Sequence, residues 1–334
     1  MIAEKRTVGH ERAVISNFAA GISSAASAQA IPKEPAYPTK PIRMVVPFTP
    51  ASATDIIARI IGPKLAEKLG WPIVVDNRPS AGGIVAFNIV AEATPDGHTL
   101  TMTGSNFAGS AALYAAKLPY DPVRDFTGIT QIASTPLILV VASSLGAKSV
   151  KELIELAKQK PGQLNFGSSG IGSGPHYGAA LFQLAAGINV VHVPYRGSPE
   201  AFTDMMGGRV AYFLSPIMAA VPYIKSGRVL GLGVTTAQRA PPMPDVPTIA
   251  EAGLAGFEYE GWYGLLAPGK TPRRVVNLLS SEIGRIVELP DIKARIESLG
   301  AAAKRSTPEE FDKLVRDEIT TRTKVWQAAG VKVE

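Results

Sequence analysis

Residues 42–70 read IRMVVPFTPASATDIIARIIGPKLAEKLG, and this stretch decides the fold class. Its first seven residues form an apolar run that predicts a buried β-strand. From Thr54 onward the apolar residues recur at helical spacing, and Gly70 ends the predicted helix. Small residues fill the loop between strand and helix, so a ligand could approach the backbone there.

The same alternation continues downstream. Residues 72–76 predict a second strand and residues 83–93 a second helix. A Pro-Asp-Gly turn at residues 95–97 leads to a third strand over residues 98–103. A β-α-β-α-β series of this kind predicts a parallel sheet covered by helices.

The rest of the chain adds further apolar strands and helices. The predicted strands are residues 136–142, 164–167, 190–194 and 229–235. The predicted helices are residues 149–160, 175–186, 199–206, 272–288, 291–299 and 308–329. Ser149 is suited to cap the first of these helices, and Pro175 and Gly187 to begin and end the second. We therefore expect an α/β protein with two doubly wound lobes, each a sheet with helices on both faces.

The composition excludes several classes of protein. The 334 residues are 46% hydrophobic and 19% charged, which is typical of a globular chain long enough for two domains. The net charge of +6 comes without a basic run interleaved with aromatic residues, so nucleic acid is not an expected partner. Cysteine is absent, which excludes disulfides and thiol chemistry. No run of about 18 apolar residues occurs, so the mature chain is not expected to span a membrane.

The N-terminus has the pattern of an export signal. Three basic residues before position 13 precede a small, moderately apolar stretch over residues 13–28, and Ala28-Gln29-Ala30 supplies a small–x–small cleavage pattern. We therefore predict a signal peptide over residues 1–30, cleavage after Ala30 and export from the cytoplasm. The alternative is a disordered cytoplasmic tail, because serines interrupt the apolar stretch and two glutamates dilute the basic region.

Two loops share a design that suits an anion. Residues 48–55 and residues 167–176 each run from the end of an apolar strand into the start of a helix. Ligands of open α/β sheets bind beyond the carboxyl ends of strands, where free backbone N–H groups and the helix dipole favour a negative group. Serine hydroxyls add donors, and a carboxylate only accepts hydrogen bonds. The alternative is that each loop merely caps its helix and makes a tight turn.

Motifs for enzymatic chemistry are incomplete or absent. The glycines at residues 170 and 172 lack the third glycine of a dinucleotide fingerprint, and neither a Gly-Lys-Ser/Thr phosphate loop nor a G-x-S-x-G elbow occurs. None of the four histidines pairs with carboxylates at metal-ligand spacing, so we predict no metal and no cofactor. His176 is the best site candidate among them because it opens a helix beside the serine-glycine loop.

A set of short motifs occurs in order over residues 37–332. These motifs are YPTKPIR (37–43), VPF (46–48), NRP (77–79), GG (82–83), PDG (95–97), LPYDP (118–122), GSSG (167–170), VPYRG (193–197), PDVPT (244–248) and GWYG (261–264). In this combination the chain resembles the Bug family, the periplasmic solute receptors of tripartite tricarboxylate transporters.

The resemblance implies a two-lobed periplasmic-binding-protein fold of type II that closes on its ligand. One lobe would comprise residues 37–135 plus 256–334 and the other residues 136–255. The chain would cross between them near Thr135-Pro136 and Phe257-Glu258. The implied protein is a non-enzymatic receptor that hands its ligand to the membrane subunits of a tripartite transporter, and we expect a monomer.

The resemblance also implies a ligand site. By position, the candidate ligand-binding residues are Phe48, Ser52, Thr54, Asp55, Ser105, Ser168, Ser169, Gly172, Ser173, His176, Arg196 and Gly197. The chain departs from the family where Ala51-Ser52 replaces a usual Gly-Gly pair, which makes positive backbone angles costlier. Because Asp55 is acidic, we expect it to hold a water or cap its own helix rather than face a carboxylate.

A second departure bears on the ligand. Many members of the family carry acidic residues near the cleft after the segment that here reads Gly208-Arg209-Val210, whereas this chain continues AYFLSP over residues 211–216. An ammonium group on the ligand is therefore disfavoured, and we expect a plain mono-, di- or tricarboxylate, aromatic acids included. A receptor that presents its ligand to a signalling protein and an α/β enzyme are the alternatives, and the sequence does not identify the acid itself.

Overall fold

The structure of this chain is a computed structural model that describes residues 37–331. The predicted signal peptide, residues 1–30, lies outside the described residues. Within residues 37–331, no helix combines the length and the apolar composition needed to cross a lipid bilayer.

A first strand group contains the parallel series that opens the chain. Strand β1 (Ile42–Val46) pairs in parallel with β2 (Ile73–Asn77) on one side and with β3 (Thr99–Gly104) on the other. The prediction of a parallel sheet is therefore confirmed for these strands. Strand β9 (Glu260–Pro268) then joins β3 in antiparallel orientation, which local periodicity could not predict because the partner lies far along the chain.

A second strand group also combines parallel strands with antiparallel ones. Strand β5 (Asn165–Ser168) pairs in parallel with β6 (Val191–Pro194) and with β7 (Tyr212–Pro216). Strand β8 (Val229–Val234) pairs in antiparallel orientation with the long strand β4 (Phe126–Ala142). The sequence prediction covered only the second part of β4, from residue 136 onward.

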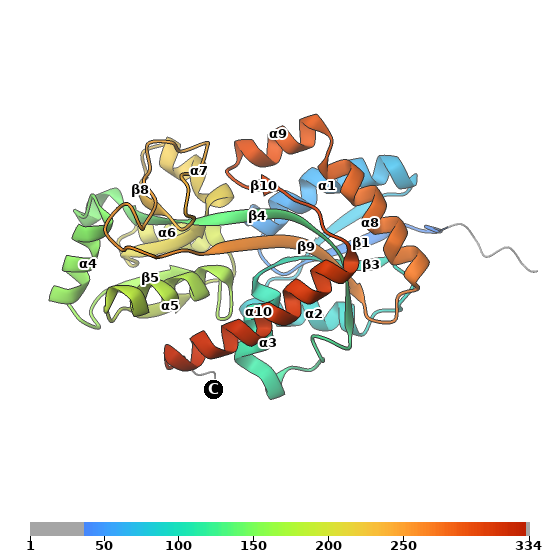
Figure 1. The fold of residues 1–334 in the computed structure, drawn as a ribbon, viewed down its shortest axis with the longest axis horizontal. Helices are drawn as coiled ribbons and strands as arrows, with labels where there is room; N and C mark the ends of the chain where they lie inside the picture. Colours follow the sequence, from blue (N-terminus) through green and yellow to red (C-terminus); the bar gives the residue numbers. More distant parts are fainter. Residues whose placement is uncertain (1–36, 332–334) are drawn as a thin grey trace, which may run out of the picture. The chain divides into compact units, whose positions relative to one another are not determined.

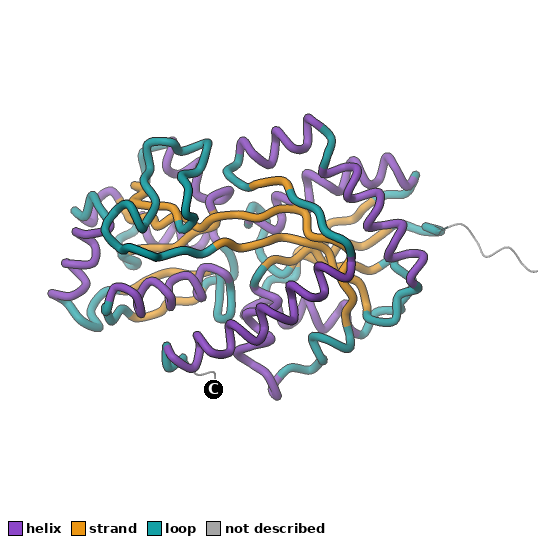
Figure 2. Tube along the Cα trace, viewed as in Figure 1, coloured by secondary structure: helices purple, strands orange, loops and turns teal. Residues whose placement is uncertain are grey.

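The long strand β4 belongs to both groups. From Phe126 to Pro136 it pairs with β9 of the first group, and from Leu137 onward it pairs with β7 and β8 of the second group. The path of strands is thus continuous, in the order β2-β1-β3-β9-β4-β7-β5-β6. Figures 1 and 2 show β4 and β9 running side by side between the two groups.

Helices flank both strand groups (Figure 1). Their bounds are α1 (Ala53–Leu69), α2 (Ile84–Ala91), α3 (Asn106–Tyr114), α4 (Val150–Gln159), α5 (Gly174–Ala186), α6 (Ser198–Met206), α7 (Ile217–Lys225), α8 (Arg273–Val287), α9 (Pro290–Ser298) and α10 (Pro308–Ala328). The short strand β10 (Ala302–Ala303) adds an edge to β4. Helix α3, helix α7 and strand β7 were not predicted, because their small or uniformly apolar residues lack a clear amphipathic period.

The predicted helix ends agree with the structure. The Ser149 hydroxyl accepts a hydrogen bond from the Glu152 amide at the start of α4. Pro175 occupies the first turn of α5, and Gly187 ends that helix in the left-handed conformation. Such caps satisfy backbone groups that a helix leaves unpaired at its ends, so they can be read from sequence.

Helix α10 joins the two strand groups by a second route. It packs against α3, β4 and α5 (Figure 1). Near its C-terminal end, the indole of Trp326 is only 2% exposed and shares an apolar core with residues of α4, α5 and β7. The indole Nε1 donates to the Gly109 carbonyl on α3, at 3.3 Å. One helix therefore contacts elements on both sides of the site described next.

Candidate functional site

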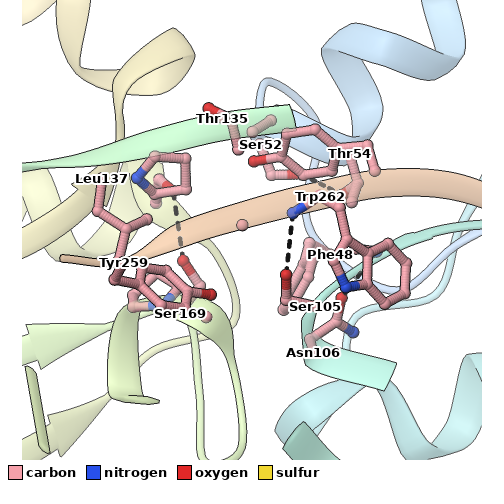
Figure 3. Close-up of a pocket in the computed structure, with 18 residues that line it drawn as sticks. Phe48, Ser52, Thr54, Ser105, Asn106, Thr135, Leu137, Ser169, Tyr259 and Trp262 are labelled. Atoms are coloured by element: carbon pink, nitrogen blue, oxygen red, sulfur yellow. Dashed lines mark hydrogen bonds between the residues drawn. The ribbon is translucent and has the colours of Figure 1, made fainter. Parts of the chain in front are cut away.

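A cavity with an empty volume of about 430 Å³, part of it open to solvent, lies where the two strand groups meet. Figure 3 shows Phe48, Thr54, Ser105 and Asn106 on one side of it and Leu137, Ser169 and Tyr259 on the other. The remaining lining residues are Ser52, Ala53, Gly104, Thr135, Gly174, Pro175, Ser198, Pro216, Gly261, Trp262 and Tyr263. The walls therefore come from both strand groups and from the segments that connect them.

Four helices begin at this cavity. Ala53, Asn106, Gly174 and Ser198 are the first residues of α1, α3, α5 and α6, and all four line it. The first N–H groups of a helix lack partners within the helix, and the helix dipole places a partial positive charge there. Several such ends around one cavity favour a negatively charged ligand.

None of the 18 lining residues in the described part of the chain is Asp, Glu, Lys, Arg or His. The lining residues carry hydroxyls, an amide, two phenols, an indole N–H and backbone N–H groups as polar groups, together with aromatic rings, prolines and Leu137 as apolar groups. An anion would thus be held by neutral donors. A ligand ammonium would find no carboxylate among the lining side chains.

The loop between β1 and α1 is held in shape by side chains behind it. Ala51 adopts a positive φ of 63°, as the replacement of a glycine there suggested. Its amide donates to the Asp55 carboxylate at 2.9 Å. Asn77 donates through Nδ2 both to the Phe48 carbonyl, at 2.9 Å, and to Asp55, at 3.0 Å. Asp55 therefore braces the loop and does not line the cavity.

The ionisation of Asp55 follows from these contacts. Burial alone raises the pKa of this carboxyl, but hydrogen bonds from Arg59, the Ala51 amide and Asn77 outweigh burial and hold the pKa below its ordinary value. The side chain pairs with Arg59 at 2.9 Å and is 3% exposed. Asp55 is thus a charged brace at neutral pH, in line with the expectation that it would not face a ligand carboxylate.

Ser105 links the start of α3 to β9. Its hydroxyl accepts from the Trp262 amide at 3.0 Å (Figure 3), and its own amide donates to the Trp262 carbonyl at 3.1 Å. The Trp262 indole Nε1 is buried and has no hydrogen-bond partner within residues 37–331. A buried donor without a partner is costly, because it has lost its hydrogen bonds to water.

The loop between β5 and α5 contributes less to the cavity than its composition suggested. Of the candidate residues in it, only Ser169 lines the cavity, where its hydroxyl lies 3.3 Å from that of Ser198. The Ser168 hydroxyl contacts His192 at 2.6 Å, and the Ser173 hydroxyl caps α5 by accepting from the His176 amide. Whether these hydroxyls reach a ligand stays a prediction, but their contacts are internal to the protein.

Gly172 and His176 are also not among the residues that line the cavity. Gly172 has a φ of 80°, and a Cβ built on it would lie 2.8 Å from the Ser110 hydroxyl of α3. Its amide donates to His176 Nδ1 at 3.1 Å. His176 stacks on His192 with the ring centroids 3.9 Å apart, and it packs against Trp326.

Both stacked histidines are neutral at physiological pH. Burial, with a further contribution from His192, lowers the pKa of His176 to about 2. Burial also lowers the pKa of His192 to about 4. A neutral imidazole can accept the Gly172 N–H, whereas an imidazolium cannot. His176 thus sets the shape of the serine-glycine loop from behind.

Arg196 and Gly197 lie at the rim. The Thr49 amide donates to the Arg196 carbonyl at 3.4 Å, and the Thr49 hydroxyl to Glu200 at 3.2 Å. A Cβ on Gly197 would lie 2.1 Å from the Thr49 hydroxyl. These two candidate residues therefore connect the two sides of the cavity at its edge, while their neighbour Ser198 lines it.

Several lining residues were missed by sequence reasoning. Tyr259, Trp262 and Tyr263 lie in or next to the GWYG motif at residues 261–264, which carried the family resemblance without an assigned role. Thr135 stands where the chain was expected to cross between lobes. Asn106 follows the candidate Ser105. Pro216 ends the segment AYFLSP, which the resemblance had placed near the cleft. Leu137 gave no signal, because nothing in an apolar strand marks the residue that will face a ligand.

The fold is that of the periplasmic solute-binding proteins: two strand groups, joined by crossing segments, border a small cavity between them. Within this class, the chain belongs to the family described as "Tripartite tricarboxylate transporter family receptor", whose model matches residues 57–331. The resemblance to the Bug family is thereby confirmed.

Individual relatives agree with this assignment. Protein BugT of Bordetella pertussis is 32% identical over 316 residues, which cover 94% of this chain and 95% of that protein. The structure described as "R. palustris Rpa4515 with adipate" is 34% identical with a TM-score of 0.85, over 89% of this chain and 99% of that one. MatC of Rhodopseudomonas palustris, with bound malate, is 33% identical with a TM-score of 0.82, over 86% and 99%.

Proposed function

We propose that this chain is an extracytoplasmic binding protein that captures a small carboxylate and delivers it to the membrane subunits of a tripartite tricarboxylate transporter. The observation that carries the proposal is a cavity at which four helices begin and which, within residues 37–331, no charged side chain lines. Such a cavity suits an anion that accepts hydrogen bonds from neutral donors. The bound adipate and malate in two similar structures support a carboxylate as that anion.

The donors divide into two sets. Ser52 and Thr54, whose hydroxyls lie 3.3 Å apart, belong to the start of α1. On the other side, Ser169 directly follows β5 and Ser198 begins α6. We infer that a carboxylate engages backbone N–H groups and hydroxyls of these sets, while aromatic rings cover the carbon skeleton. Gly172, Ser173 and Asp55 would support the loops rather than touch the ligand.

We also propose that the protein closes around its ligand as two lobes, residues 37–135 plus 256–334 and residues 136–255. The change of pairing partner in β4 between Pro136 and Leu137 supports a hinge at that point. A ligand that touches both lobes favours the closed state by its differential affinity for that state. Small-angle scattering should therefore report compaction on ligand addition.

Export to the periplasm is part of the proposal. It rests on the small–x–small pattern at residues 28–30 and on the periplasmic class of the fold. Mass spectrometry of the protein from its host should find a mature chain beginning at Ile31. A chain that retains Met1 would contradict export, and size-exclusion chromatography with light scattering would test whether the mature chain is a monomer.

A thermal-shift screen tests the binding function directly. The panel comprises mono-, di- and tricarboxylates, aromatic acids and amino acids, each compared with its neutral amide. A ligand at 100 times its dissociation constant stabilises the folded state by about 2.7 kcal/mol, and for a chain of this size we expect a rise in Tm of about 5 °C or more. If no acid raises the Tm, the proposed function is wrong. If a bound acid is turned over, the protein is an enzyme instead.

A further inference from the structure

A buried guanidinium lies directly behind the cavity wall. Arg322 of α10 is 2% exposed, although arginine stays charged in proteins. Its Nε pairs with Glu318 at 3.0 Å, and its Cζ lies 4.1 Å above the centre of the Tyr177 ring. Its Nη1 is buried without a hydrogen-bond partner in the described part of the chain. The positive charge is therefore only partly satisfied by protein groups.

One lining residue connects this charge to the cavity. Arg322 Nη2 donates to the Tyr259 hydroxyl at 3.2 Å. Tyr259 is 7% exposed and lines the cavity (Figure 3). A Cβ built on Gly174 would lie 3.2 Å from this hydroxyl, and one built on Gly261 would lie 3.4 Å from it. The hydroxyl thus sits beside the first residue of α5, among the helix N-termini that surround the cavity.

The direction of this hydrogen bond determines what Tyr259 can do. A phenol has one proton to donate, and its oxygen can accept. Arginine only donates, so Tyr259 is the acceptor in this pair and keeps its own proton. A hydroxyl that accepts from a cation is polarised, which makes it a stronger donor. A ligand carboxylate is a suitable acceptor for that proton.

We propose that Tyr259 donates a hydrogen bond to the ligand carboxylate, and that Arg322 is a positioning residue whose charge reaches the ligand through Tyr259. This inference rests on the proposed carboxylate-binding function. It assigns the site a preference for a carboxylate over a neutral group of the same shape. The lining side chains carry no charge that could supply this preference.

The placement has a physical advantage over a lysine or arginine inside the cavity. A cationic side chain in the cavity wall would be hydrated while the cavity is empty, and it would lose that water each time a ligand binds. In the empty cavity it would also attract any anion. Arg322 is already packed between Tyr177 and Tyr259, so its desolvation is part of folding. The same arginine touches α5 through Tyr177 and the segment before β9 through Tyr259, and both tyrosines belong to one apolar core.

The test compares an acid with its amide in four variants. Calorimetric titration uses the acid of the screening panel that binds wild-type protein most tightly, together with its neutral amide. The variants are Tyr259→Phe, Arg322→Gln, Arg322→Lys and the control Arg316→Gln, which changes an exposed arginine on the same helix. Circular dichroism and thermal melting check that each variant folds.

We expect Tyr259→Phe to weaken acid binding by about tenfold or more, as for loss of a hydrogen bond to a charged group. Arg322→Gln should weaken acid binding by about three- to tenfold, with amide binding changed by less than about twofold in both variants. Arg322→Lys should restore most of the affinity, because it keeps the charge. Arg316→Gln should bind like wild type.

Two results would overturn the inference separately from the proposed function. If wild-type protein binds an acid but folded Tyr259→Phe binds it equally well, Tyr259 is not a ligand donor. If Arg322→Gln weakens acid and amide alike, Arg322 only maintains packing. Should Arg322→Gln fail to fold, Tyr259→Phe and Arg322→Lys decide the question. If the wild-type protein binds no acid at all, the proposed function itself fails.

Discussion

The two strand-to-helix loops look alike in sequence and differ in the structure. The first, residues 48–55, contributes Phe48, Ser52, Ala53 and Thr54 to the cavity. The second, residues 167–176, is richer in glycine and serine, yet only Ser169, Gly174 and Pro175 of it line the cavity. Its other small residues pack against α3 and against the stacked histidines. A loop of small residues can serve close packing as readily as ligand approach.

The support behind each loop explains the difference. The first loop is braced from behind by the charged and polar side chains of Asp55 and Asn77, so its front is free to meet a ligand. The second loop has a neutral histidine as its brace and lies against a helix of the other strand group. Changes in the first loop should therefore act mainly on binding, and changes in the second mainly on stability.

Among the single substitutions, the largest effect is expected where the second loop meets α3. Gly172→Ala combines a positive φ with backbone contacts of about 3 Å to Ser110, which should lower the free energy of unfolding by about 2–4 kcal/mol. The matched control is Gly187→Ala, at a φ of 61° with nothing within 4 Å of the added Cβ, for which we expect about 1 kcal/mol. Urea denaturation measures both, and equal losses would show that packing against α3 is unimportant.

The histidine brace should make stability depend on pH. The folded-state pKa values of about 4 for His192 and about 2 for His176 lie below the value near 6.5 of an unfolded chain. Between pH 6.5 and 4 the unfolded chain therefore binds more protons than the folded one, and protonation favours unfolding. We expect each of the two histidines to lower the free energy of unfolding by up to about 3 kcal/mol over this window in urea titrations.

A non-titrating replacement isolates the source of that pH dependence. His192→Gln keeps a hydrogen-bonding group beside Ser168 but cannot gain a proton in this range. Its stability should depend less steeply on pH than that of the wild type. The same slope in both proteins would mean that the stacked histidines do not control the effect.

A pair of serine variants separates binding from capping within the second loop. Ser169→Ala removes a lining hydroxyl and should weaken ligand binding by about tenfold. Ser173→Ala removes a helix cap and should cost about 1 kcal/mol of stability with a smaller effect on affinity. Calorimetric titration and urea denaturation of both variants give the two quantities. If instead Ser173→Ala weakened binding and Ser169→Ala lowered only stability, Ser173 would be the serine that contacts the ligand.

The smallest effect is expected in the first loop. Ala51 holds a φ of 63°, which costs a residue with a Cβ about 1–2 kcal/mol, whereas glycine adopts it freely and loses more entropy on folding. The net result for Ala51→Gly should be a gain in stability of about 0.5 kcal/mol, with ligand affinity unchanged. A loss of stability would mean that the alanine methyl group makes a contact that compensates for the backbone conformation.

Local features of the chain determined much of this protein. The alternation that begins at residue 42 predicted β1, α1, β2, α2 and β3, and no predicted end of these elements is more than two residues from the observed end. Ser149, Pro175 and Gly187 marked helix ends correctly. The motifs in series also predicted the family, which the family model confirms. These signals are readable because hydrophobic period, capping and turns depend on residues close together in sequence.

Tertiary structure alone decided which side chains meet at the cavity. Strand β9 returns antiparallel beside β3 and brings Tyr259 and Trp262 to loops more than a hundred residues away in sequence. Helix α10 then places Arg322 behind Tyr259. For the serine-glycine loop, the sequence allowed both ligand approach and tight turning, and the contacts that Gly172 makes with Ser110 and His176 are visible only in the tertiary structure. Which way a small residue faces depends on what packs against it, and those partners come from distant parts of the chain.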